Sequence, residues 1–239
     1  MEYYSRTLFG VKYGVMKQSG KTSGQVATGV AAVLERAYPG ARALLKRRML
    51  EGALACFNEH GIEPTTIDMV LAKCEASVGN LYHHFGSKDG LVAALFFCAL
   101  ADQASLVDEE LARAETMKEG VAALVYSYVD WVSAQPELAR FMFQARSAVS
   151  KGLQARELMQ RNRDRNKAVM AWFAQPDRIG GLKALPPELL FSLIIGAAEN
   201  YSRAWLSGRV KASPMQYREL LAEAVWASVG ASPMSRSSK

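Results

Sequence analysis

The chain has 239 residues, of which 50% are hydrophobic and 22% charged, and its formal net charge is +6 at pH 7. This composition excludes collagen-like, mucin-like and wholly disordered chains, and the positive charge favours a polyanionic partner such as nucleic acid without identifying one. The longest apolar stretch, Leu91–Ala101, is shorter than the roughly 20 residues that cross a bilayer, so we expect no transmembrane helix.

Residues 1–40 are rich in Gly, Ser and basic residues and show no sustained periodicity, apart from a short helix predicted over Val30–Ala37. We interpret this segment as an N-terminal arm that is a disordered tail, or as the product of a start codon assigned too early, with Met16 as the true start. The alternative is an arm whose Lys and Arg side chains lie along DNA phosphates. The segment lacks the apolar core and cleavage site of an export signal, which favours a cytoplasmic protein.

Helical periodicity begins after residue 40. A first helix is predicted over Ala41–His60, because an apolar stripe recurs every four residues and Gly61 is a C-cap signal. The capping-box pattern Thr65-x-x-Asp68 opens a second helix that ends near residue 74. Two more helices start at Ser caps, the third over residues 77–85 and the fourth from residue 87 onward.

The second half of the chain is predicted to be helical as well. The expected helices are Lys118–Ala134, Pro136–Ala148, Gly152–Ala174, Pro187–Ser207 and Pro214–Val229. No segment alternates in the manner of a strand, so the predicted fold class is all-α.

The second and third predicted helices are short, are separated by two residues and follow a longer helix, which is the outline of a helix-turn-helix motif. On the third helix Leu81 and Phe85 share one side, while Gly79, Asn80 and His83 lie opposite. One face can therefore pack while the other reads DNA. Short helices joined by tight turns also occur in ordinary bundles, and the outline alone leaves both interpretations open.

The residues of this region resemble a known family. The sequence TTI at 65–67, followed by SVGNLYHHFGSKDGL at 77–91, is similar to the N-terminal DNA-binding domain of the tetracycline-repressor (TetR) family. The resemblance covers about residues 41–94 and implies a three-helix reading head, joined through the fourth helix to a helical effector-binding and dimerisation domain over 95–239. We keep the name reading head for residues 41–94.

The resemblance also implies roles for single residues. Phosphate contacts would fall on Thr66, Tyr82, His83 and Lys88, and base-reading positions on Ser77, Val78, Gly79 and Asn80. Formal charge balances over residues 41–90, so the Lys46-Arg47-Arg48 cluster must supply the favourable field, and Arg47 joins the expected DNA-binding residues.

Two positions depart from the family pattern. Glu75 stands where the family has Gly, and a positive φ there costs about 1 kcal/mol or more for a residue with a side chain. Val78 stands where the family often has Lys or Arg, so an apolar contact, for example with a thymine methyl group, replaces a charged one. The operator sequence therefore cannot be carried over.

The last two predicted helices carry broad apolar stripes. Their residues are Leu190, Leu193, Ile194, Ala197, Tyr201, Ala204 and Trp205 on one helix, and Tyr217, Leu220, Leu221, Ala224, Val225 and Ser228 on the other. By resemblance, these helices form a four-helix interface with the same pair of a twofold-related subunit, which predicts a homodimer. Burial within one subunit is the alternative.

A ligand cavity is expected among the middle helices. The candidates to line it are Trp131, Phe141, Phe143 and Trp172, with Glu199 and Asn200 as polar groups that orient the ligand. The alternative for the aromatic residues is ordinary core packing. The alternative for the polar pair is a buried hydrogen bond across the dimer interface. The basic run over residues 156–167 is interpreted as a solvated helix face, with attraction for an anionic effector such as an acyl-CoA as the alternative.

Catalytic and metal-binding patterns are weak. The segment Ser19-Gly20-Lys21-Thr22 lacks the glycine spacing and the preceding strand of a phosphate-binding loop, and adjacent His83 and His84 point about 100° apart on a helix. The three cysteines have neither disulfide-scaffold nor zinc-site spacing. We therefore expect no enzyme activity, no cofactor and no metal.

These observations predict a sequence-specific transcriptional regulator, a repressor that a small-molecule ligand releases from a pseudo-palindromic operator. Two alternatives stay open. One is a ligand-independent nucleoid or architectural DNA-binding protein, and the other is a helical small-molecule carrier or enzyme with a vestigial DNA-binding head.

Overall fold

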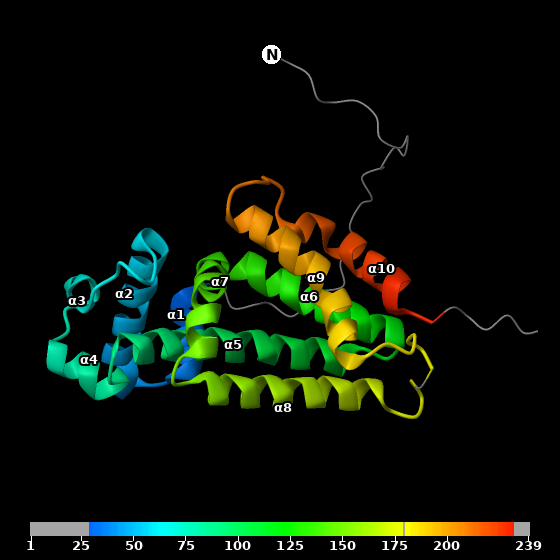
Figure 1. Cartoon of the computed structure of the whole chain (residues 1–239), viewed down its shortest axis with the longest axis horizontal. Helices are drawn as coiled ribbons and strands as arrows, with labels where there is room; N and C mark the ends of the chain where they lie inside the picture. Colours follow the sequence, from blue (N-terminus) through cyan, green and yellow to red (C-terminus); the bar gives the residue numbers. More distant parts are fainter. Residues whose placement is uncertain (1–28, 179, 232–239) are drawn as a thin grey trace, which may run out of the picture.

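The computed structural model describes residues 29–178 and 180–231, and within them the chain forms ten α-helices and two short 3-10 helices (Figure 1). The first half contains α1 (Val30–Ala37), η1 (Ala41–Ala43), α2 (Leu44–His60), α3 (Ile67–Cys74), α4 (Val78–Phe85) and α5 (Lys88–Arg113). The second half contains α6 (Met117–Ala134), α7 (Pro136–Lys151), α8 (Ala155–Phe173), α9 (Pro187–Leu206), η2 (Pro214–Tyr217) and α10 (Arg218–Val229).

The predicted all-α class is confirmed. Across the described ranges, the sole β pairing is an isolated bridge between Leu182 and Gly230. The last predicted helix begins with the 3-10 turn η2, capped by the Ser213 side chain, before α10 continues it. The sequence signals of Ser caps and first-turn prolines therefore locate the helix starts well.

The helix α5 runs through the length of the molecule and joins its two ends (Figure 1). Its start lies beside α4, Leu91 and Leu95 are fully buried, and it packs on α1, α2, α6 and α7. By length and composition alone α5 would qualify as a membrane span, but more than half of its most apolar stretch is buried. Packing as a core helix accounts for that composition. The predicted domain boundary at residue 94 falls inside this continuous helix.

The last part of the predicted arm is a packed helix. The helix expected over Val30–Ala37 is confirmed as α1, and its Val33 and Leu34 are buried in the same cluster as the core of α2 and α5. Arg36 of α1 donates from Nε to the Asp102 carboxylate of α5 over 3.0 Å. The rest of the arm, residues 1–28, lies outside the described residues.

Two apolar clusters make up the core. The first includes residues of α1 to α5 and extends into α7, where Phe141 stacks on Phe57 of α2 with ring centroids 5.6 Å apart. The second joins α6, α8, α9 and α10. A bidentate ion pair adds to the second cluster, with Arg218 Nε of α10 lying 2.6 Å from Asp130 Oδ1 of α6.

Candidate DNA-binding surface and ligand cavity

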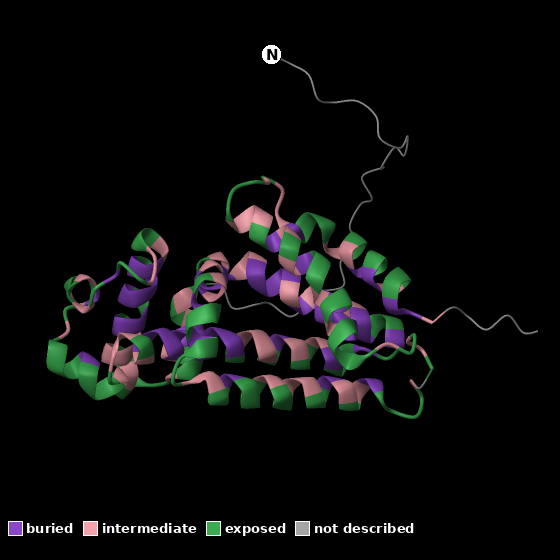
Figure 2. Cartoon of the chain, viewed as in Figure 1, coloured by how far each residue is buried: buried purple, intermediate pink, exposed green. Residues whose placement is uncertain are grey.

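The helix α4 presents one face to the protein and the other to solvent. Leu81 is fully buried and Phe85 half-buried, whereas Val78 and Tyr82 are 50% and 49% exposed and Gly79, Asn80 and His83 are exposed as well. Figure 2 shows the outer side of α4 as exposed over most of its length. The division predicted from the helical wheel is therefore present, and these exposed side chains are not covered by the described part of the chain.

Local capping fixes where α4 starts. Ser77 lies in an extended conformation, and its Oγ accepts a hydrogen bond from the Asn80 backbone N–H over 3.2 Å. The Oγ accepts this bond while its own proton remains available to donate to a phosphate or a base. At the other end, Gly86 adopts a positive φ of 71° and closes the helix on the Tyr82 carbonyl oxygen.

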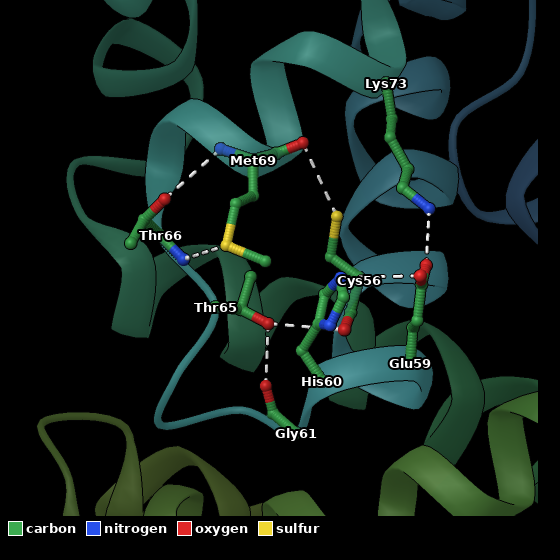
Figure 3. Close-up of polar contacts among 8 residues, drawn as sticks. All are labelled: Cys56, Glu59, His60, Gly61, Thr65, Thr66, Met69 and Lys73. Atoms are coloured by element: carbon green, nitrogen blue, oxygen red, sulfur yellow. Dashed lines mark hydrogen bonds and ion pairs between the residues drawn. The ribbon is translucent and has the colours of Figure 1, made fainter.

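The start of α3 differs from the predicted capping box by one residue (Figure 3). The N-cap is Thr66, whose Oγ1 accepts from the Met69 backbone N–H over 3.2 Å, while Met69 Sδ faces the Thr66 N–H. Thr65 is buried, and its hydroxyl donates to the Gly61 carbonyl oxygen over 2.6 Å. The expectation of a Thr65–Asp68 box is wrong because Thr65 ties the incoming loop to the end of α2. Thr66 stays exposed, with a hydroxyl proton available to a phosphate.

The turn between α3 and α4 contains the strain that the sequence suggested. Glu75 has φ 52° and ψ 36°, and it is the sole residue other than glycine with a positive φ in the described ranges. Its side chain is exposed. A left-handed backbone at this position explains why a glycine is favourable there, and the exposed carboxylate adds a negative charge beside the α4 surface.

Two of the expected DNA-binding cations are used inside the protein. Lys88 Nζ donates to the carbonyl oxygens of Ile62, Glu63 and Thr65 at 2.9 to 3.0 Å, which occupies all three donors of an ammonium group. Arg47 donates to the carbonyl oxygens of Tyr38 and Gly40 and pairs with Glu35 over 2.6 Å. Both side chains therefore hold loops of the reading head in place, and their contact with phosphate stays a prediction.

Other cations remain near α4. Lys46 Nζ lies 3.9 Å from the centre of the Tyr38 ring and 5.6 Å from that of Phe85, so the start of α2 lies beside the end of α4. Arg42 and Arg48 are exposed and have no acidic partner among the residues that the structure describes. Burial, His83 and Lys46 together lower the pKa of His84, which favours its neutral form.

A cavity of about 720 Å³ opens among α5, α6, α7, α8 and α9. Its apolar part includes Phe96, Leu100, Val107, Leu124, Met142, Leu158, Val169, Phe191 and Ile195. Its polar part includes Gln103, Tyr128, Arg146, Asn162, Arg165, Asn166, Ser192, Glu199, Asn200 and Arg203. Burial and nearby Glu199 raise the pKa of the Tyr128 hydroxyl, so it remains a hydrogen-bond donor at neutral pH.

The structure brings two of the six expected ligand-binding residues to this cavity. Glu199 and Asn200 line it, and Glu199 Oε1 accepts from Arg203 Nη2 over 2.6 Å. The aromatic candidates lie elsewhere. Trp131 is buried with its Nε1 donating to Asp102 Oδ2 over 2.9 Å, and Phe141 is the fully buried partner of Phe57.

The remaining two aromatic candidates pack against arginines. Trp172 donates from Nε1 to the Leu111 carbonyl oxygen over 3.0 Å, and its ring faces the Arg178 guanidinium at 3.7 Å. Phe143 faces Arg203 at 4.3 Å from the ring centre. The assignment of these aromatic residues to the cavity is therefore corrected. In each case a packing partner far along the chain or a cation decides the position of the side chain.

The helix α8 also lines the cavity, a role that was not predicted from the sequence. The lining residues Leu158, Asn162, Arg165, Asn166 and Val169 recur at helical spacing on one face of α8. That periodicity was available in the sequence, but the surrounding basic run masked it. Arg156, Arg161, Arg163 and Lys167 are exposed as expected of a solvated face, whereas Arg165 is turned to the cavity.

No group of three or more His, Cys, Asp or Glu side chains that would hold a metal ion occurs within residues 29–178 and 180–231. The three cysteines are buried singly, and burial raises the pKa of each thiol.

Residues 49–95 match the model of the bacterial regulatory proteins of the tetR family. A 95-residue stretch is 35% identical to the HTH-type transcriptional repressor AcnR of Corynebacterium glutamicum. The matched segment, from α2 to the start of α5, is therefore similar to the DNA-binding domain of the tetR family. The match to AcnR covers 40% of this chain and 49% of the repressor, so the chain spans about half the length of this curated relative.

Solved structures extend the likeness to the fold of the second half of the chain. A TetR family transcription regulator from Marinobacter aquaeolei has a TM-score of 0.67 at 19% identity and covers 79% of this chain and 96% of its own. FadR from Bacillus subtilis, solved with stearoyl-CoA, has a TM-score of 0.62 at 14% identity and covers 75% of this chain and 97% of its own. At these identities the likeness concerns the fold alone.

Proposed function

We propose that this protein is a transcriptional repressor of the tetR family that binds operator DNA through α4 as a homodimer, in the cytoplasm, and releases it when a small molecule occupies the cavity. The observation that carries the proposal is the exposed side of α4. Ser77, Val78, Gly79 and Asn80 lie there at the N-terminal end, and Tyr82 and His83 follow one turn later. A recognition helix in the major groove uses its first turns in this way.

The chemistry of this face fits DNA. Asn80 offers the amide pair that bonds adenine edges, Val78 offers apolar contact for a thymine methyl group, and Tyr82 and His83 offer donors for phosphate oxygens. Gly79 supports the proposal by its surroundings. A Cβ atom there would meet only Ser77 Oγ, at 3.9 Å, so the packing of the protein itself does not require a glycine. A missing side chain on this exposed face lets an external backbone approach closely.

The homodimer is supported by the outer faces of α9 and α10. Leu189, Leu193 and Leu220 are 37% to 50% exposed, and the small residues Gly196 and Ala197 on α9 are exposed too. Apolar and small side chains on adjacent helices allow the close approach that a helical interface needs. A twofold pair of α4 helices would then meet two half-sites on one face of the duplex.

The effector response is supported by α5. The helix begins at Lys88, shortly after α4, and its Phe96, Leu100, Gln103 and Val107 line the cavity. A ligand that favours one position of α5 therefore favours one spacing of the two α4 helices. DNA release then requires only that the ligand binds more tightly to the conformation whose spacing does not fit the operator. The stearoyl-CoA in the FadR structure is a precedent for a ligand in this fold.

The test is recovery of bound duplexes from a library of genomic fragments, followed by a screen of metabolites for release of the selected duplex. The four Trp residues, Trp131, Trp172, Trp205 and Trp226, all lie outside the reading head, so their emission reports ligand binding independently of DNA. The proposal expects a pseudo-palindromic selected sequence and a compound that both changes Trp emission and releases DNA. DNA binding that no compound alters would instead indicate an architectural protein, and no selective duplex binding at low salt would remove the DNA-binding function.

The dimer is tested with Leu193→Lys, which places a charge on the exposed face of α9. Sedimentation should show a shift from dimer to monomer and a weaker affinity for the full operator. The matched control is Leu153→Lys, because Leu153 is 91% exposed in the turn between α7 and α8. If the two variants sediment alike as dimers, α9 is not the dimer interface.

A further inference from the structure

One arginine of α8 enters the cavity without an acidic partner. Arg165 lies on the face of α8 whose ends, Leu158 and Val169, are buried, and Asn162 and Asn166 flank it on the same face. Within the described residues, the Arg165 side chain makes no hydrogen bond and no ion pair. Burial first, and then the neighbouring Arg146, lower the pKa of Arg165. An inward face with a polar centre is unusual for a helix that only completes a core.

The charges around the cavity are unbalanced. The charged residues of its lining are Arg146, Arg165, Arg203 and Glu199. Glu199 is already paired with Arg203, and no described carboxylate lies within 4.0 Å of Arg146 or Arg165. A desolvated charge without a partner is costly, and two cations that face the same space repel each other. The lining therefore has an excess of two positive charges without protein counter-ions.

The rest of the lining is apolar. Phe96, Leu100, Val107, Met142 and Phe191 come from three helices and surround the polar face of α8. A positively charged ligand would be repelled here, and a neutral apolar ligand would desolvate Arg165 further without pairing it. An apolar molecule with one acidic end satisfies both parts of the surface.

We infer that the effector is an apolar molecule with a single acidic group, a carboxylate or a phosphate, and that Arg165 receives this group with Arg146 beside it. The inference rests on the proposed function, since it names the chemical class of the effector for the same cavity. The planar guanidinium of Arg165 presents parallel donors that match two oxygens of either acid. Asn162 and Asn166 supply further amide donors along the same face of α8.

The experiment compares three probes that share one alkyl chain: dodecanoate, dodecyl phosphate and dodecan-1-ol. Binding to the full chain, without DNA, is measured by displacement of an anionic fluorescent dye and checked by calorimetry. At least one acid should bind more tightly than the alcohol by a factor of about 10 to 100, the range that charge-assisted hydrogen bonds give. The tighter acid identifies the head group. Equal affinity of all three probes would overturn the inference.

Variants of α8 locate the acid group. Arg165→Gln should abolish the preference for the acid and leave the affinity for dodecan-1-ol unchanged, which shows that the cavity is still folded. Arg163→Gln is the matched control, because it removes the same charge from an exposed position of the same helix. Arg165→Lys should retain part of the preference, since it keeps the positive charge but loses the parallel donors of the guanidinium group. Equal losses of acid affinity in the Arg165→Gln and Arg163→Gln variants would overturn the assignment.

A DNA assay separates this inference from the proposed function. Acid binding that depends on Arg165 but never releases the operator would refute effector-controlled release and leave the anion site standing. Release by uncharged compounds alone, with no binding of either acid, would refute the anion site and leave the repressor standing.

Discussion

The reading head and the cavity domain build their surfaces in different ways. In the head, Thr66 and Ser77 each fix a helix start by bonding a backbone N–H three residues further along the chain. Around the cavity, polar side chains arrive from α5, α6, α7, α8 and α9, and only the packing of those helices brings them together. The first surface depends on local geometry, and the second depends on contacts between distant parts of the chain.

This difference has a consequence for how each region responds to substitution. The pair Asp130–Arg218 joins residues 88 positions apart, and Trp172 reaches a carbonyl oxygen 61 positions away. Loss of such a link disturbs several helices together. The exposed side chains of α4 form no such link to a distant helix. Their substitution should therefore change DNA recognition while the fold stays intact.

The largest expected effect comes from Asp130→Ala. Asp130 is 4% exposed and Arg218 20% exposed, so the variant leaves a largely buried guanidinium without its partner. We expect a loss of about 3–5 kcal/mol in the free energy of unfolding, measured by urea denaturation at a fixed protein concentration. The control Glu157→Ala removes one carboxylate from the exposed pair with Arg161 and should cost less than about 1 kcal/mol. Similar losses of unfolding free energy in both variants would show that contacts between distant parts of the chain do not dominate the stability of the cavity domain.

Lys88→Met tests whether a residue of the reading head serves the fold or the DNA. Because its ammonium group binds three loop carbonyls, we expect a loss of about 2 kcal/mol in stability. The slope of log affinity against log salt concentration should stay unchanged in a DNA titration.

The matched control for Lys88 is Lys73→Met, which removes an ammonium group that pairs with the exposed Glu59. It should change stability by less than about 1 kcal/mol. If the Lys88 variant keeps its stability and lowers the salt slope by about one unit, Lys88 contacts a phosphate after all.

The sequence predicts the α4 surface of the reading head, which depends on local geometry, better than it predicts the cavity, which several helices form together. The two faces of α4 follow from the spacing of Leu81 and Asn80 alone, and the strain at Glu75 follows from the resemblance to a family that usually has Gly at this position. The N-cap of α3 was placed one residue early, because Thr65 and Thr66 are the same residue type. Only the tertiary bond from Thr65 to the Gly61 carbonyl oxygen distinguishes them.

The cavity could not be predicted to the same degree. Phe141 has the composition of a cavity residue, but its position is decided by Phe57, which lies 84 positions earlier in the chain and on another helix. Arg163 and Arg165 look alike in a basic run, and only the helical phase set by Leu158 and Val169 turns one of them inward. Large apolar side chains and basic runs therefore predict burial and charge, but they do not predict which residues these side chains contact in the folded protein.

Asn80→Ala isolates base reading from folding. The Asn80 side chain is exposed, so the free energy of unfolding should stay within about 0.5 kcal/mol of the parent value. The discrimination at one base pair should fall by about 1–3 kcal/mol if the amide bonds an adenine edge at two points. The measurement is affinity at fixed salt for a panel of operator duplexes with single base-pair changes. Gln144→Ala, an exposed amide on α7, is the control and should leave the panel unchanged. A uniform loss over the whole panel would argue that Asn80 contacts the backbone of DNA.

The smallest expected effect concerns Glu75, where the local surface carries strain. Glu75→Gly relieves the left-handed backbone at φ 52°, and the greater entropy of glycine in the unfolded chain offsets part of the gain. We expect a net gain of about 0.5–1 kcal/mol in stability, measured by urea denaturation. Glu75→Ala removes the same carboxylate but keeps the strained backbone, so it should not raise stability. Both variants should bind DNA more tightly at low salt, because each removes a negative charge beside α4. If Glu75→Ala stabilises the protein as much as Glu75→Gly, the carboxylate and not the backbone is the source of the cost. The stability cost at this turn would then be electrostatic.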